Sequence, residues 1–179
     1  FEAAKAIDLD IGMDRAQLAQ AIHDTQAANG MQTDAHARLM VTRGVKSRPF
    51  QHPSLSRQGP TVAIIMEHSR PKLPRPIRLA TVPHIRGLPM SQDPKLNSHS
   101  KLNCILACIA AEKAGADEAL TLDVHGCVTT TNACNFFIVR KGEVWTSTGD
   151  YCMNGITRGK VIDLCRLNGI PVFQKNFSL

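Results

Sequence analysis

The spacing of apolar residues in the first part of the chain predicts one amphipathic helix followed by strands. Apolar residues recur at helical spacing from Asp14 to about Ala28, and Asn29-Gly30 is a typical helix end. Three apolar segments with proline and glycine between them then predict strands at residues 37–42, 61–66 and 77–82. The first part of the chain is therefore expected to be α+β.

A long loop separates this part from a second region that also mixes helices and strands. Residues 86–100 are rich in proline, glycine and polar side chains, and so predict a loop. The following pattern predicts helices at 102–114 and 157–167, a strand at 118–122, a hairpin at 136–146 and a strand from 171. We therefore expect a partial N-terminal domain at 1–86, an interdomain loop at 87–100 and a partial C-terminal domain at 101–179.

Composition narrows the class of protein. With 43% apolar and 20% charged residues, the 179-residue chain is expected to be globular, and its apolar stretches fall short of the roughly 20 residues of a membrane-spanning helix. The net charge of +6 comes from scattered Lys and Arg with few aromatic residues, which favours a basic pocket for small anions over nucleic-acid binding. The six cysteines lack metal-site spacing and predict reduced thiols in a cytoplasmic protein. The opening residues are typical of the middle of a helix, so the chain is expected to be incomplete.

Four segments in a fixed order carry a resemblance to a known family. They are Val41-Thr42-Arg43-Gly44, the lysine and helix leading into Ala116-Asp117-Glu118-Ala119-Leu120, the segment from Val128 to Phe137, and Asn154-Gly155-Ile156-Thr157-Arg158. Together they resemble the fold type IV pyridoxal-phosphate (PLP) enzymes of the branched-chain and D-amino-acid aminotransferase family, also called aminotransferase class IV. The resemblance implies two α/β domains with PLP between them, here truncated at both ends, and at least a dimer.

The family chemistry requires a lysine that forms an aldimine with PLP and then moves a proton at the substrate α-carbon. Lys101 follows the loop and opens a predicted helix, so it is the expected catalytic residue. The spacing differs from the family, because the family lysine is usually about four residues further from the glycine that corresponds to Gly115. Lys95 is the alternative, although it lies inside the loop after Pro94.

Gly155, Ile156 and Thr157 precede or open the last predicted helix, where unpaired N–H groups and the helix dipole favour an anion. The resemblance places the cofactor phosphate there. The alternative is that Thr157 only caps the helix. Met153 stands where the family has an aliphatic residue against the cofactor ring, with simple core packing as its alternative.

Thr130 departs from the family pattern. The family usually has a glutamate at this position, which keeps the pyridine nitrogen of PLP protonated. A threonine can donate a hydrogen bond but carries no charge, so we expect a weaker electron sink. Alternatively, another acid takes this place, or Thr130 has no contact with the cofactor.

Arg48 lies five residues beyond Arg43, where D-amino-acid aminotransferases have an arginine that binds the substrate carboxylate. Phe50 replaces the histidine that accompanies it in that pattern, and a solvated arginine is the alternative. Arg43, at the end of its strand, is expected to be structural.

The resulting hypothesis is an aminotransferase that exchanges an amino group between an amino acid, branched-chain or D-, and a 2-oxo acid. A lyase of the aminodeoxychorismate type on the same scaffold and a non-catalytic protein of the same fold are the alternatives.

Overall fold

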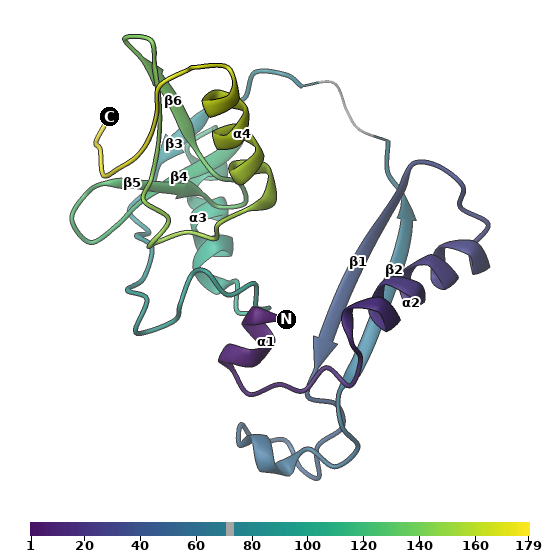
Figure 1. The fold of residues 1–179 in the computed structure, drawn as a ribbon. Helices are drawn as coiled ribbons and strands as arrows, with labels where there is room; N and C mark the ends of the chain where they lie inside the picture. The colour runs from purple at the N-terminus through teal and green to yellow at the C-terminus, as the bar shows by residue number, and fades with distance from the viewer. Residues whose placement is uncertain (71–73) are drawn as a thin grey trace. The chain divides into compact units, whose positions relative to one another are not determined.

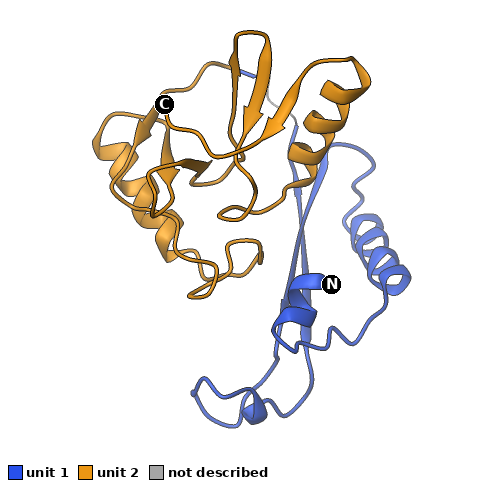
Figure 2. Cartoon of the chain, turned by 60° about the vertical axis from the view of Figure 1, so that its left-hand side comes forward, with its two compact units in different colours: residues 1–74 blue, residues 75–179 orange. Residues whose placement is uncertain are grey.

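The computed structural model describes residues 1–70 and 74–179 and divides into two compact units, residues 1–74 and 75–179 (Figures 1 and 2). The loop-rich composition predicts the division within residues 87–100. The structure divides earlier because β3 (Leu79–Thr81) pairs in parallel with β4 (Glu118–Leu122), so the residues before the loop belong to the second unit. None of the described helices is long and apolar enough to cross a membrane.

The first unit contains a hairpin and the helix that the apolar spacing predicts. Its elements are α1 (Glu2–Ala6), α2 (Arg15–Ala28), β1 (Ala35–Thr42), the 3-10 helix η1 (Pro53–Leu55) and β2 (Thr61–His68). A capping box begins α2, because Asp14 accepts from the Gln17 backbone and Gln17 accepts from the Asp14 backbone. Leu18 is the buried residue of this helix, which contacts β2.

The end of β1 is fixed by Arg43 and Gly44. Strands β1 and β2 pair antiparallel from Ala35–His68 to Thr42–Thr61. Arg43 donates to the carbonyl oxygens of Asp8 and Ile7, which supports its structural interpretation. Gly44 has a φ of +73°, and a Cβ there would collide with the Gly59 carbonyl.

The second unit opens with a sheet covered by a helix. The sheet has the order β3-β4-β5, with β5 at Val128–Thr131, and α3 (Leu102–Lys113) packs on β3 and β4. A small core joins them; its buried members are Val82, Ala107, Ala111 and Ala119. The predicted third strand, 77–82, is therefore present but shorter.

A second sheet and a last helix complete this unit (Figure 1). The sheet has the order β6-β7-β8, with β6 at Phe137–Arg140, β7 at Glu143–Thr146 and β8 at Val172–Gln174. Lys141 and Gly142 both have positive φ, as a tight hairpin turn requires. The helix α4 (Ile156–Leu167) contacts β8.

Candidate active site

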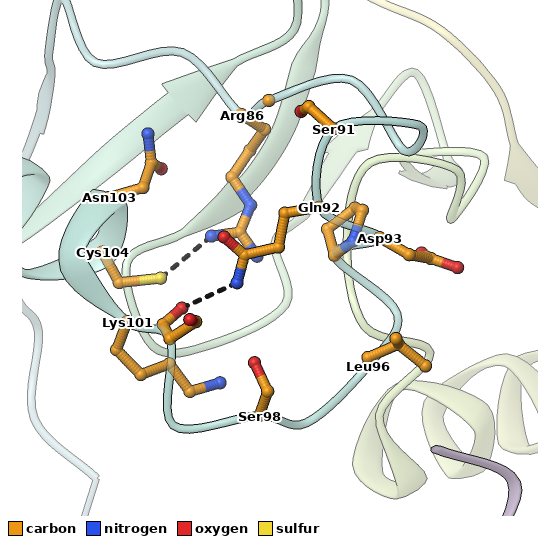
Figure 3. A pocket seen from close by; sticks show the side chains of 12 residues that line it. Arg86, Ser91, Gln92, Asp93, Leu96, Ser98, Lys101, Asn103 and Cys104 are labelled. Atoms are coloured by element: carbon orange, nitrogen blue, oxygen red, sulfur yellow. Dashed lines mark hydrogen bonds between the residues drawn. The ribbon is translucent and has the colours of Figure 1, made fainter. Parts of the chain in front are cut away.

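Lys101 lies at the N-cap of α3 and borders a pocket of about 250 Å³ (Figure 3). Its Nζ donates a hydrogen bond to Asn97 Oδ1 over 3.2 Å, and its backbone N–H donates to the His99 carbonyl. Lys95 is not among the described residues that line this pocket, and its backbone N–H is bound to Asp93 Oδ1. The pocket therefore favours Lys101 of the two lysines.

Arg86 connects the start of α3 to the loop before α4. Its Nη1 donates to Cys104 Sγ over 2.9 Å, and its Nε donates to the Tyr151 carbonyl over 3.3 Å (Figure 3 draws the first bond). Its backbone N–H donates to Leu122 O at the end of β4. Cys104 is three residues after Lys101, so one half-buried arginine holds the lysine segment beside the segment that leads to Gly155.

The N-terminus of α4 is shaped by Gly155. This glycine is the N-cap, and no side chain caps the helix. Asn135 Nδ2 donates to the Met153 carbonyl over 2.9 Å, and a Cβ on Gly155 would lie 2.5 Å from Asn135 Oδ1. Because the first N–H groups of a helix have no intrahelical acceptor, Ile156 and Thr157 present free donors there. Thr157 is the second residue of the helix and not its cap, so the capping interpretation of Thr157 is wrong.

Arg158 adds a buried positive charge close to this helix start. It is 5% exposed, and its guanidinium donates to Ser147 O, Asn154 Oδ1 and Gln174 Oε1 at 2.7–3.2 Å. No carboxylate of the described residues forms an ion pair with it. Uncapped N–H groups and a cation with no acidic partner among the described residues fit an anionic group such as the PLP phosphate.

Thr130 is buried in β5, and its hydroxyl is already engaged. Its Oγ1 donates to the Cys134 carbonyl over 2.6 Å. Neighbouring threonines form similar bonds: Thr121 Oγ1 donates to Thr130 O, and Thr129 Oγ1 donates to Thr121 O. Thr130 can therefore accept a hydrogen bond from a ligand, but its proton is used by the Cys134 carbonyl, just beyond the end of β5.

Glu118 is the acid of the same sheet. Thr130 pairs with Thr121, so these two side chains share one face of the sheet, whereas Glu118 lies an odd number of residues from Thr121 and faces the other side. Glu118 therefore does not replace the missing charge beside Thr130.

The remaining predicted site residues lie at two further places. Met153 and Ile156 are exposed at the start of α4, as a contact with a bound ring or phosphate requires. Arg48 belongs to the first unit, in the connection between β1 and β2, where its guanidinium lies 5.5 Å from the Phe50 ring centroid. Its predicted contact with substrate stays a prediction.

Residues 1–179 match the sequence profile of amino-transferase class IV. The chain belongs to this family. Its fold agrees, since the branched-chain aminotransferase of the archaeon Thermoproteus uzoniensis, solved with norvaline, has a TM-score of 0.86 and 30% identity. That similarity covers 99% of this class IV chain and 60% of the solved chain.

Two curated relatives show how much of a class IV protein this chain represents. It is 37% identical over 181 residues to branched-chain-amino-acid aminotransferase-like protein 1 of Arabidopsis thaliana, covering 100% of this chain and 33% of that protein. It is 31% identical over 187 residues to a D-alanine aminotransferase of Listeria monocytogenes, covering 100% of this chain and 62% of the enzyme. The chain thus spans less than two thirds of these relatives.

Two residues of this class IV chain have no role in the sequence-based interpretation. The family spacing places the lysine about four residues before Lys101. Asn97 stands at that position, and it is the hydrogen-bond partner of Lys101. The sequence around Arg86 indicates only that it begins a loop. Its partners are distant in sequence, so neighbouring residues do not predict its contacts.

Proposed function

We propose that this chain is part of a PLP-dependent aminotransferase that moves an amino group between an amino acid, branched-chain or D-, and a 2-oxo acid. The observation that supports this most is the Arg86 bridge. It joins the segment of Lys101 to the loop before α4, through Cys104 and Tyr151. A lysine amine and an anion-binding helix start are the two features that such an enzyme must bring together.

Each residue has a defined part in this proposal. The N–H groups of Ile156 and Thr157, with the Thr157 hydroxyl, bind the phosphate, and Gly155 lets Asn135 lie close to the helix start. Met153 packs against the ring. Lys101 would hold the cofactor through its amine and would move a proton at the substrate α-carbon, and Asn97 would orient that amine. When bound, PLP supplies an electron sink for the electrons of the α-carbon. Arg48, in the first unit, is the proposed ligand of the substrate carboxylate, and the proposed assembly is a homodimer.

Thr130 supports a second candidate, a class IV protein that binds PLP without transamination. Its hydroxyl donates to Cys134 O and carries no charge, so it cannot hold a proton on the pyridine nitrogen as a carboxylate does. Thr130 therefore lowers the expected rate of transamination in either case, and a complete loss would leave only binding.

The test is an absorption spectrum of the chain with PLP, followed by borohydride reduction and peptide mapping. We expect a visible band and a label on Lys101, both lost in Lys101→Ala and both retained in Lys95→Ala. A label on Lys95, or on no lysine, would overturn the assignment of Lys101. A labelled protein that transfers no amino group from any branched-chain or D-amino acid would leave the binding protein as the function.

A further inference from the structure

Asn135 stands at the end of a short turn that begins at Thr130. The two residues form an isolated antiparallel bridge, so the turn closes on itself. The same turn is bonded to β4, because Asn132 Oδ1 accepts from the Ala119 backbone over 2.7 Å and the Asn132 N–H donates to the Ala119 carbonyl over 3.1 Å. The backbone of Asn135 therefore has a fixed place relative to the sheet β3-β4-β5.

The side chain of Asn135 extends from this turn to the start of α4. Its Nδ2 donates to the Met153 carbonyl over 2.9 Å and to Sγ of the fully buried Cys152 over 3.5 Å. Its Oδ1 would lie 2.5 Å from a Cβ on Gly155, and no other described residue would come within 4 Å of that Cβ. Gly155 has φ −63° and ψ 149°, which alanine also adopts, so the Asn135 carboxamide is what requires a glycine there.

The Met153 carbonyl connects this contact to the helix. It also accepts from the Gly155 N–H over 2.9 Å, so Asn135 holds the tight turn of residues 153–155 that immediately precedes α4. No side chain caps the helix, and its first N–H groups have no intrahelical acceptor. The direction in which these N–H groups point follows from the turn that Asn135 holds.

We propose that Asn135 is a positioning residue, which directs the first N–H groups of α4 toward a bound phosphate. This inference rests on the proposed function and assigns the orientation of its phosphate site to a side chain outside the helix. An amide suits the task, since it donates to the Met153 carbonyl without adding negative charge, whereas a carboxylate could not donate and would repel a phosphate. Because Thr130 and Asn135 belong to one turn, the wall at Thr130 and the phosphate site keep a fixed separation.

The test is a double-mutant cycle on the 179-residue chain without cofactor, with inorganic phosphate as the probe. Titration gives the phosphate affinity, and the amide NMR shifts of residues 156 and 157 report the helix start. Asn135→Ala should weaken phosphate binding about three- to tenfold, the range expected when one hydrogen bond is lost. Gly155→Ala should weaken it to the same extent, because its Cβ displaces the carboxamide. The double variant should bind no more weakly than either single variant.

Gly159→Ala is the matched control, because it makes the same change one turn further along α4, where an added Cβ meets none of the described residues. It should bind phosphate as the unchanged chain does. If Asn135 served only to stabilise the fold, its loss would lower the midpoint of urea unfolding and leave the phosphate affinity of the folded chain and the two amide shifts unchanged.

Three results would overturn the proposal: unchanged phosphate affinity in Asn135→Ala, losses that add up in the double variant, or no phosphate binding by the unchanged chain. Labelling of Lys101 by PLP is a separate measurement that does not use these variants. The proposed function can therefore stand when this inference fails, and the two failures are distinguishable.

Discussion

Lys101 Nζ donates a hydrogen bond to Asn97 Oδ1, 3.2 Å away, across the four residues that lead into α3. The two side chains therefore reach the same small volume, although only one of them carries an amine. Under the proposed function, this contact would let the Lys101 amine reach a site that is built around position 97.

That relationship predicts where an added amine would react. In Asn97→Lys, we expect PLP and borohydride to place most of the label on residue 97, because its amine starts from the family position. Peptide mapping by mass spectrometry measures the division of the label. Asn97→Ala is the control and should leave the label on Lys101. If Asn97→Lys is still labelled only on Lys101, residue 97 does not reach the reactive position.

Thr130→Glu should make the stability of the chain depend on PLP. Thr130 is 5% exposed, so a carboxylate there should lower the free energy of unfolding by about 1–3 kcal/mol without a partner. Bound PLP offers a protonated ring nitrogen and should recover part of this loss. Urea unfolding with and without PLP measures both effects. Thr129→Glu is similarly buried in the same strand and should lose stability without recovery; equal recovery in both would place the ring elsewhere.

Arg158→Met should destabilise the second unit strongly. The change leaves the Ser147 carbonyl, Asn154 and Gln174 without their donors, which should lower the free energy of unfolding by about 2–5 kcal/mol. Fluorescence of Trp145, the single tryptophan, reports unfolding of this unit in urea. Arg166→Met, on the exposed side of α4, should change stability by no more than about 0.5 kcal/mol. A similar loss in both variants would contradict this role for Arg158.

Asp117 should contribute to acid unfolding. The Arg78 backbone N–H and the Arg75 guanidinium both donate to its carboxylate, and they hold its pKa below the ordinary 3.8. Because the folded pKa is the lower one, this stabilisation is complete above about pH 4 and is lost as the pH falls through the folded pKa. Asp117→Asn should therefore be less stable than the unchanged chain at neutral pH, and the difference should shrink as the solution is made strongly acidic.

Thermal unfolding across that pH range checks the Asp117 prediction. Asp163→Asn is the control, since the Asp163 side chain is 69% exposed and lies 4.0 Å from Arg166. Its melting temperature should follow that of the unchanged chain at every pH. The role of Asp117 fails if Asp117→Asn shows the same dependence on pH as this control.

Local patterns in the sequence predict most elements, and non-local contacts account for the differences. Helix α2 and its start at Asp14 follow from apolar spacing and a capping box, both of which lie within a few residues. The division between the units cannot be predicted in this way. It depends on the parallel pairing of β3 with β4, which are separated by the whole loop and by α3, and only Leu79–Thr81 finds partners.

The candidate site shows the same limit. The motif around Gly155 predicts an anion site at the start of a helix, but the reason for a glycine is Asn135, which lies on the far side of the β6–β7 hairpin in the sequence. The role of Arg86 could not be predicted from the sequence, because its partners, Cys104, Leu122 and Tyr151, come from three separate segments. No short stretch of the sequence contains Arg86 together with the residues that it contacts.

The row of threonine hydroxyls in β4 and β5 also constrains how this sequence can change over time. Thr129 donates to Thr121, Thr121 donates to Thr130, and Thr130 donates to Cys134, so each member satisfies a carbonyl of the next. Replacing one member alters the cost of replacing its neighbour, and such substitutions are not additive. An acidic residue at position 130 would therefore be acceptable only together with a new donor for the Cys134 carbonyl. A return from threonine to an acid at this position thus needs two substitutions and should be slow.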